Sequence, residues 1–360
     1  MKFVLIGKCF SDEINGPGQV MLALKNVLDQ RYSMDSCVIF WNERNNKISF
    51  LWSVVKQLAS KEGCLINVHE SGLIIPTIVM ILSKLFPRHA YYLTMHGVYE
   101  IEAPYTGGKK WRYALLEKLL CCHFPNIICV SDLQRKTLGD IYGRRNNALV
   151  IPNGTAAVDY PISDVLPDYA GCLEMVSLGG IKERKGIKQT LNLMQFLTQR
   201  KRMNVHLSIY GTEKGNYTEE WLQKVCKEKN LTKNVSYCGV IQDKDRVYDI
   251  VSNAHFHLSL SEYDTFNIAI AESLVLGCPC ICTDRCGSSS YVHDGENGVI
   301  VSLDSEDMNE DIYNYMCSFL VDQGKRHRIT ASTEEYRKLF SWEEICTEYM
   351  ELRNESLGEK

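Results

Sequence analysis

The sequence predicts an α/β protein made of two domains, each a parallel sheet covered by helices. Three observations favour this class. The chain has 360 residues, more than one ordinary core requires. Apolar, strand-like runs alternate with helical stretches along both halves, as in βαβ proteins. Several of these runs end in glycine or a polar turn, where ligands bind in open parallel sheets.

The first half opens with a strand, 2–7, that is apolar enough to be buried on both faces. A loop at Asn15–Gln19 contains Gly16 and Gly18 and leads into an amphipathic helix at 20–28. Glycine in this loop allows backbone to approach a ligand closely. Further strands are expected at 36–40, 65–68, 90–94 and 127–130, and helices at 50–60, 74–85 and 111–122.

His96 follows the strand at 90–94 in the run Tyr-Leu-Thr-Met-His-Gly. Ligands in open α/β sheets lie beyond the carboxyl ends of strands, so this position favours a functional histidine. The alternative is a histidine that only bonds to loop backbone.

The segment Thr106–Tyr113 combines three cations with two aromatic residues before an apolar helix. Such a cluster can rest at an anionic membrane surface, where aromatics and Lys or Arg occupy the headgroup zone. One short cluster adheres weakly, however, so we interpret it as a solvated helix start with Trp111 packed inward.

The second half begins after a strand and turn at 149–154 and a less patterned linker from Pro161 to about Tyr169. A strand at 173–178 leads into a Gly-rich turn that contains Lys185. Charge-assisted bonds from lysine suit a phosphate. Strands are expected at 205–210 and 235–237, and a helix at 248–253.

The central stretch, Leu258–Thr283, is expected to form strand, turn, helix and strand. The helix is predicted over 266–276, with Asp264 or Thr265 as its N-cap and Gly277 at its end. Asp264 and Glu272 would then project from nearly the same face, roughly 12 Å apart along the axis. That separation suits two hydrogen-bonding ends of one extended ligand.

Between these acids, the helix start would offer the amides of Thr265, Phe266 and Asn267 to a phosphate. The acids and amides together describe a holder for a nucleotide-diphosphate sugar. The alternative is a capped helix with one chance glutamate, which the spacing alone does not exclude.

Composition limits the class of protein. Fifteen cysteines without an export signal are expected to remain thiols in a cytoplasm, and no Cys-x-x-Cys pair suggests zinc. The apolar stretch 73–82 contains a proline and is too short to span a membrane. Net charge is −4, divided as +6 over residues 1–150 and −10 over the remainder. A basic first half can face an anionic surface or an anionic lipid-linked substrate, although ordinary fluctuation explains it equally well.

The residues 264–279, Asp-Thr-Phe-Asn-Ile-Ala-Ile-Ala-Glu-Ser-Leu-Val-Leu-Gly-Cys-Pro, resemble the E-x7-E signature of family 4 retaining glycosyltransferases, which have the GT-B fold. Other segments are similar to that family's motifs: Val-Ile-Pro-Asn-Gly at 150–154, Gly-Gly-Ile-Lys-Glu-Arg-Lys-Gly at 179–186 and Asp-Gly-Glu-Asn-Gly at 294–298. The resemblance is dense from Ile151 to Gly298 and thin before His96.

The resemblance implies two Rossmann-like domains facing across a cleft, at 1–160 and 170–338, with a last helix at about 341–360 returning to the first. The first would be the acceptor side and the second would bind the nucleotide sugar. It implies transfer of a sugar to a hydroxyl with retention, without a metal ion or cofactor. Lys185 would neutralise the diphosphate, Glu272 would bind the ribose, and Asp264 and His96 would contact the donor sugar. The backbone at Val240 and Ile241 would read the nucleotide base, Gly18 would line the cleft, and Arg184 is a further candidate for donor contact.

The resemblance further suggests a lipid-linked glycan acceptor in surface polysaccharide synthesis, a peripheral position at the inner face of the membrane, and no nucleic-acid partner. One departure is clear: the family's arginine is replaced by Gly180, with Lys182 or Arg184 as possible substitutes. This departure, and Asp264 in place of glutamate, keep open the alternative of a non-catalytic subunit of a glycosyltransferase complex. A second alternative is a sugar-nucleotide epimerase, which shares the two-domain fold.

Overall fold

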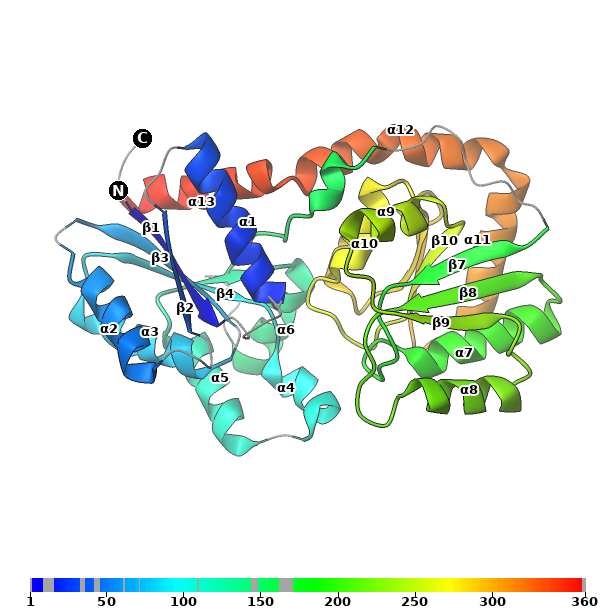
Figure 1. Ribbon diagram of the computed structural model, residues 1–360, viewed down its shortest axis with the longest axis horizontal. Helices are drawn as coiled ribbons and strands as arrows, with labels where there is room; N and C mark the ends of the chain where they lie inside the picture. The colour runs from blue at the N-terminus through cyan, green and yellow to red at the C-terminus, as the bar shows by residue number, and fades with distance from the viewer. Residues whose placement is uncertain are drawn as a thin grey trace. The chain divides into compact units, whose positions relative to one another are not determined.

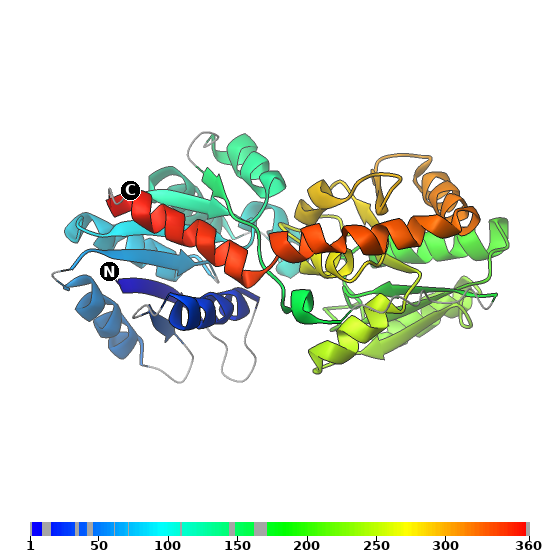
Figure 2. The same ribbon diagram turned by 90° about the horizontal axis from the view of Figure 1, so that it is seen from above.

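The computed structural model describes residues 2–8, 16–32, 36–41, 46–60, 62–70, 72–108, 110–143, 148–161 and 171–357. They form two compact α/β units (Figures 1 and 2). Unit 1 comprises residues 1–154 and 341–360, and unit 2 comprises residues 155–340. Each contains a six-stranded sheet in which every described strand pair is parallel. The α/β prediction is confirmed.

The sheet of unit 1 has the order β2-β1-β3-β4-β5-β6. Its strands are β1 (Lys2–Lys8), β2 (Ser36–Trp41), β3 (Cys64–His69), β4 (Ala90–Met95), β5 (Asn126–Cys129) and β6 (Ala148–Val150). The connecting helices are α1 (Gly16–Arg31), α2 (Lys47–Leu58), α3 (Ile74–Leu85), α4 (Tyr99–Glu102), α5 (Trp111–His123) and α6 (Asp132–Tyr142), with the 3-10 turn η1 (Ala103–Thr106) after α4.

The chain leaves β1 towards β2 and then returns to the other side of β1 for β3. The direction of winding therefore reverses between β1 and β3. Ligands of open α/β sheets bind at such a reversal, beyond the carboxyl ends of the strands. The terminal helix α13 (Trp342–Leu357) packs beside α1 over this sheet, where Leu24 and Tyr349 share a core with Phe3.

The sheet of unit 2 has the order β12-β11-β10-β7-β8-β9. Its strands are β7 (Leu173–Ser177), β8 (Val205–Tyr210), β9 (Val235–Gly239), β10 (Phe256–Ser259), β11 (Cys280–Thr283) and β12 (Gly298–Val301). Its helices are α7 (Ile187–Gln195), α8 (Glu219–Glu228), α9 (Lys244–Ser252), α10 (Ile268–Val275), α11 (Met308–Val321) and α12 (Gln323–Leu339), with short turns η2 (Ala156–Asp159), η3 (Phe196–Arg200) and η4 (Gly287–Tyr291).

The core of unit 2 divides over the two faces of its sheet. Apolar side chains of α7, α8 and α11 share one core with β7, β8 and β10, while α9 and α10 lie on the other side (Figure 1). Here the winding reverses between β7 and β10. The loops after these two strands, 178–186 and 260–267, are therefore the expected ligand position of unit 2.

Two sequence predictions for unit 1 need correction. The helix α1 begins at Gly16, so Gly18 is a buried helical residue and not part of a loop. Proline is well tolerated in the first turn of a helix, and this allows Pro17 to be included. Asn15 and most of the predicted linker lie outside the described residues. Trp111 is 73% exposed at the start of α5, so the inward packing predicted for it is wrong.

Candidate functional site

The loop after β7 is fixed against the loop after β10 by main-chain contacts. The amide of Glu262 donates to the carbonyl of Arg184 at 2.8 Å. Gly186 begins α7 with a φ of +72°, and a Cβ at this position would lie 1.7 Å from the carbonyl oxygen of Leu260. Only glycine fits such an approach. The two loops are therefore held together as one support for the side chains they carry.

Asp264 is paired with cations of the opposite loop. Lys185 Nζ donates to Asp264 Oδ2, and Arg184 Nη1 lies 3.9 Å from Asp264 Oδ1 while donating to the carbonyl of Tyr263 at 2.9 Å. Burial alone would raise the pKa of Asp264, but Lys185, Arg184 and the amide of Phe266 together lower it. Asp264 is therefore an ionised carboxylate although it is only 8% exposed.

Lys182 adds a third cation to this loop. Burial, together with the neighbouring charges of Lys185 and Arg184, lowers the pKa of Lys182 to about 8. These three side chains concentrate positive charge around one carboxylate at the reversal of the sheet. An anion with more than one negative charge, such as a diphosphate, complements that arrangement.

Gly180 cannot be replaced by the family's arginine on this backbone. Its φ is +69°, and a Cβ would lie 2.2 Å from the carbonyl oxygen of Thr212. A side chain here would meet main chain that cannot move aside. The positive charge that the family has at this position can only come from a neighbouring residue, and Lys182 is two positions away.

The helix prediction for the central stretch needs correction. The helix α10 spans only Ile268–Val275, so Asp264 and Thr265 precede it and are not its N-cap. The N-cap is Asn267, with a φ of +65°. The reason is non-local: the main chain of residues 264–266 bonds to residues 285–288, which prevents an earlier start. Asp264 and Glu272 therefore do not project from one helix face, and the estimate of their separation along an axis does not apply.

The backbone amides available to bind a phosphate therefore differ from those predicted. The N–H of Phe266 donates to the Asp264 carboxylate. The first-turn amides of α10 belong to Ile268 and Ala269, and first-turn amides have no acceptor within their own helix. These two groups are the better placed donors for an anion.

Glu272 lies in the middle of α10 and is 3% exposed. Its Oε1 lies 3.7 Å from Lys244 Nζ and 3.5 Å from Thr155 Oγ1. Burial raises the pKa of Glu272, while Lys244 and Thr155 counter that effect. Neither partner was recognisable from the sequence, because both are distant along the chain. A carboxylate held in this way can accept hydrogen bonds from ligand hydroxyls.

Three residues predicted to contact the donor lie outside the two loops of Lys185 and Asp264. Val240 and Ile241 follow the edge strand β9, and Val240 is 51% exposed. His96 follows β4 in unit 1, at the predicted strand end, and its Nε2 lies 2.9 Å from Nδ1 of His69. Burial lowers the pKa of His96 to about 4, and lowers that of His69 further. Both rings are neutral near pH 7, so His96 can exchange hydrogen bonds with a ligand but carries no charge.

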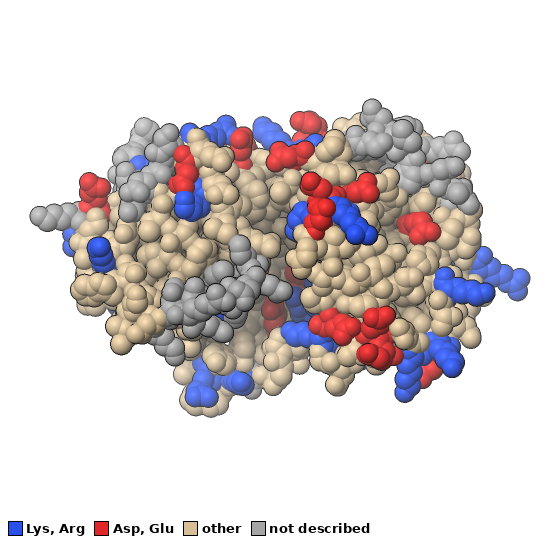
Figure 3. Space-filling model, viewed as in Figure 1, with Lys and Arg blue, Asp and Glu red and all other residues tan. Residues whose placement is uncertain are grey.

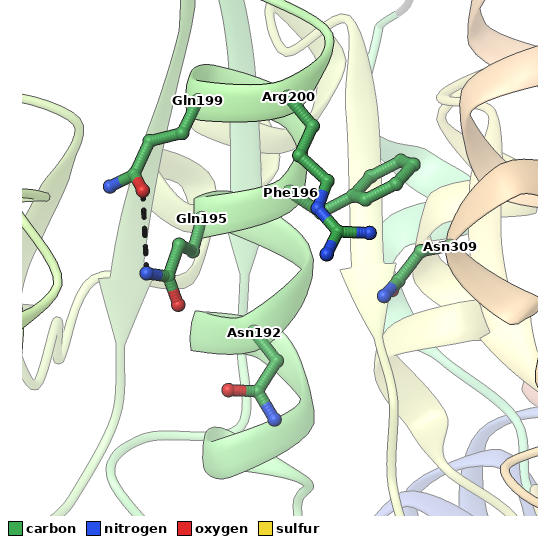
Figure 4. A pocket seen from close by; sticks show the side chains of 6 residues that line it. All are labelled: Asn192, Gln195, Phe196, Gln199, Arg200 and Asn309. Atoms are coloured by element: carbon green, nitrogen blue, oxygen red, sulfur yellow. Dashed lines mark hydrogen bonds between the residues drawn. The ribbon is translucent and has the colours of Figure 1, made fainter.

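A second depression in unit 2 is formed by residues of α7, η3 and α11 (Figure 4). Its lining is polar, and Gln195 Nε2 donates to Gln199 Oε1 at 3.4 Å. A helix that joins parallel strands ends near their amino termini, so this depression lies at the opposite end of the sheet from Lys185. It is therefore separate from the candidate site.

The described residues hold neither a candidate metal site nor a membrane-spanning helix. No three His, Cys, Asp or Glu residues gather as a metal site among the residues that the structure describes. Over the same parts of the chain, no helix is long and apolar enough to cross a membrane.

Comparisons with known proteins agree with this geometry. Residues 168–336 match the model of the family described as glycosyl transferases group 1. No curated protein sequence matches the chain. Among solved structures, sucrose-phosphate synthase from Thermosynechococcus elongatus has a TM-score of 0.77 at 17% identity, covering 100% of both chains.

Two further structures have the same fold at low identity. Anabaena HepE in complex with UDP has a TM-score of 0.76 at 15% identity, over 99% of this chain and 100% of that one. The lipopolysaccharide outer core galactosyltransferase WaaB has a TM-score of 0.73 at 16% identity, covering 100% of both. The chain therefore has the GT-B fold of glycosyltransferases, and its residues 168–336 match the glycosyl transferases group 1 family.

Proposed function

We propose that the protein transfers a sugar from a nucleotide-diphosphate donor to a hydroxyl of an acceptor, with retention of the anomeric configuration and without a metal ion. The observation that carries this proposal is the group of Lys182, Arg184 and Lys185 around Asp264 at the β7–β10 reversal. The leaving diphosphate gains negative charge in the transition state, and cations already in position stabilise it. HepE, with the same fold, was solved with UDP.

Each residue has a place in this proposal. Lys185 and the first-turn amides of Ile268 and Ala269 bind the diphosphate. Asp264 accepts hydrogen bonds from hydroxyls of the transferred sugar, and Glu272 accepts them from the ribose. The loop before α10 also contributes Thr265, Phe266 and Asn267 to the donor site. The nucleotide base lies against Val240 and Ile241. His96 is assigned to the donor sugar and Gly18 to the donor by the resemblance alone.

The acceptor is proposed to be a glycan carried on a lipid, with unit 1 in contact with an anionic membrane. Exposed apolar side chains gather on three helices of this unit: Ile48, Leu51 and Trp52 on α2, Ile74, Ile81 and Leu85 on α3, and Trp111, Tyr113 and Leu115 on α5. Lys110 and Arg112 flank Trp111 in the sequence, and Figure 3 shows Lys and Arg at the lower edge of unit 1. Exposed aromatics beside cations suit a headgroup layer.

The activity is tested by supplying UDP-glucose, UDP-galactose, UDP-N-acetylglucosamine and GDP-mannose one at a time, with and without EDTA. We expect one donor to raise the melting temperature and to release its nucleoside diphosphate slowly by transfer to water, unaffected by EDTA. If no donor stabilises the protein or is cleaved, a non-catalytic subunit becomes the better reading. A new nucleotide sugar formed without acceptor would indicate an epimerase.

The membrane contact is tested by sedimentation with vesicles of phosphatidylcholine alone and of phosphatidylcholine with phosphatidylglycerol. We expect binding only to the anionic vesicles, and less binding when Trp111 is changed to Ser. Equal binding of the W111S variant and the unchanged protein would contradict this part of the proposal.

A further inference from the structure

The depression between α7, η3 and α11 in unit 2 has a volume of about 350 Å³ and takes no part in the proposed transfer reaction. Small-ligand sites in proteins have volumes of about 300–1,000 Å³, so the space is large enough for one. Its lining consists of Asn192, Gln195, Phe196, Gln199, Arg200 and Asn309 (Figure 4). The depression is therefore a candidate binding site of its own, at the end of the sheet opposite Lys185.

One wall of the depression is a single stripe of a helical segment. The lining positions 192, 195, 196, 199 and 200 recur every three or four residues, so their side chains lie on one face. The stripe continues from α7 into η3, which is a π-helical turn over Phe196–Arg200. Such turns are rare and occur frequently at functional sites.

Lys229, at the end of α8, fixes the orientation of two side-chain amides on this stripe. Its Nζ donates to Asn192 Oδ1 at 2.9 Å and to Gln195 Oε1 at 2.8 Å. Because both oxygens are occupied, each amide has its NH2 group left to offer. Gln195 Nε2 donates to Gln199 Oε1 at 3.4 Å, a long hydrogen bond that a ligand can replace. The stripe therefore presents hydrogen-bond donors to the depression.

Arg200 adds a positive charge to these donors. Its side chain is exposed and makes no ion pair with any residue that the structure describes, whereas the adjacent Lys201 is paired with Glu310 at 2.7 Å. In Figure 4 the Arg200 side chain turns back along the helix to the level of Gln195. Within the described parts of the chain, no carboxylate lines the depression. A guanidinium binds a carboxylate or phosphate through two parallel hydrogen bonds, so an anionic group complements this wall.

Asn309, in the first turn of α11, offers the opposite kind of group. Its Oδ1 is buried and accepts no hydrogen bond from the part of the chain that the structure describes. A buried acceptor without a donor costs free energy, and a ligand hydroxyl would remove that cost. Phe196 supplies a partly buried ring between these polar groups. The lining therefore suits a ligand with an anionic group, a hydroxyl and an apolar C–H surface.

We propose that this depression binds a sugar ring that carries one carboxylate or phosphate, either as a unit of an anionic glycan or as a free sugar phosphate. Arg200 binds the anionic group, the amides of Asn192 and Gln195 donate to ring oxygens, and a ring hydroxyl donates to Asn309 Oδ1. None of these residues belongs to the proposed donor site. The binding therefore does not depend on the transfer reaction.

The test uses ligand-detected NMR saturation transfer with the whole protein. The probes are methyl glucuronide, glucose 6-phosphate and the neutral methyl glucoside, with inorganic phosphate as a competitor. We expect a signal from at least one anionic sugar, a much weaker one from methyl glucoside, and little displacement by inorganic phosphate. A signal from the glucuronide assigns a glycan unit, and a signal from glucose 6-phosphate alone assigns a free sugar phosphate.

Two variants assign the signal to this depression. Arg200→Met should weaken the binding by about fivefold or more, because it removes a partly solvated charge-assisted contact. Arg202→Met, at an exposed cation outside the lining, should leave the binding unchanged. Asn192→Asp keeps the oxygen that Lys229 binds but replaces the NH2 donor by a negative charge, so it should abolish the signal.

The melting temperature without ligand shows whether each variant is folded, and all three substitutions should leave it nearly unchanged. The proposal is overturned if no anionic sugar gives a signal, or if methyl glucoside binds as tightly as the anionic sugars. Displacement by an equal concentration of inorganic phosphate would also overturn it, since the ring would then contribute nothing. The same holds if the signal survives in the R200M variant or falls equally in the R202M variant.

Discussion

The ammonium of Lys185 donates to the carboxylate of Asp264, although the two residues lie on loops after different strands of the sheet. The side chains are 19% and 12% exposed, so the pair is largely shielded from water. In the proposed reaction the two groups serve different parts of one donor, the diphosphate and the sugar. In this structure each of the two groups is the ionic partner of the other.

Asp264→Asn should lower the free energy of unfolding by about 1.5–3 kcal/mol at pH 7, the range for a charge-assisted hydrogen bond. The folded pKa of Asp264 lies below its ordinary value of 3.8, so its contribution is present above that value and is lost as the pH falls through the folded pKa. Urea unfolding at pH 7 and at pH 3 measures both effects. Asp311→Asn, at an exposed position of α11, is the control. An equal difference at both pH values would remove the ion pair as the cause.

Lys185→Met should reduce kcat more than it raises KM for the nucleotide sugar. The reason is that the charge on the leaving diphosphate grows in the transition state and its need for a cation grows with it. Steady-state kinetics on the donor that is cleaved separate the two constants. Equal losses in kcat and in donor affinity would mean that Lys185 only anchors the donor.

Lys182 should make diphosphate binding depend on pH. Because its pKa is about 8, the side chain loses its charge as the pH rises above that value, and affinity for UDP should fall between pH 7 and pH 9. Lys182→Met should bind more weakly at pH 7 and lose most of this dependence. Calorimetric titration with UDP at several pH values measures it. Lys224→Met, on the exposed face of α8, should behave as the unchanged protein does. A pH dependence that survives in the K182M variant would exclude Lys182.

Glu272→Ala should weaken nucleotide binding by about 1.5–3 kcal/mol, which is roughly 10- to 150-fold in Kd. The loss reflects a charged hydrogen bond to the ribose. Titration with the nucleoside diphosphate tests this, with Glu228→Ala on the exposed side of α8 as the matched control. Unchanged affinity in the E272A variant would place Glu272 outside the site.

Gly180→Ala should destabilise the protein more than Gly215→Ala. Both glycines have positive φ, +69° and +64°, and so share the cost of about 1–2 kcal/mol that a side chain meets there. Only Gly180 has a carbonyl oxygen, that of Thr212, at 2.2 Å from the added Cβ, whereas Gly215 faces open space. The difference in melting temperature between the two variants isolates this contact. Equal melting temperatures would show that position 180 can accept a side chain.

The strands were largely predictable because their apolar runs are continuous, as buried parallel strands require. The prediction for 205–210 coincides with β8, and the prediction for 74–85 coincides with α3. The start of α10 was not predictable from the sequence. Asp264 is a good N-cap residue by its local chemistry. Only its main-chain hydrogen bonds to residues 285–287 prevent it from being the N-cap of α10. The short strand β12 also has too little pattern of its own to be identified.

The candidate site was only partly accessible from the sequence. Asp264, Lys185 and Glu272 belong to recognisable motifs, but their partners do not. Thr155 and Lys244 reach Glu272 from distant positions in the sequence. Side chains without a shared local motif acquire a common environment only through tertiary folding.

The close approach of Gly186 to Leu260 leaves the two loops of unit 2 no freedom to separate. In the proposed reaction, a donor that enters between Lys185 and Asp264 would replace their contact with each other. Its phosphate would bind the Lys185 ammonium, and the released Asp264 carboxylate would bind the sugar. Recognition of the two ends of the donor would then be a single cooperative event, and a nucleotide lacking its sugar would leave the liberated acid without a partner.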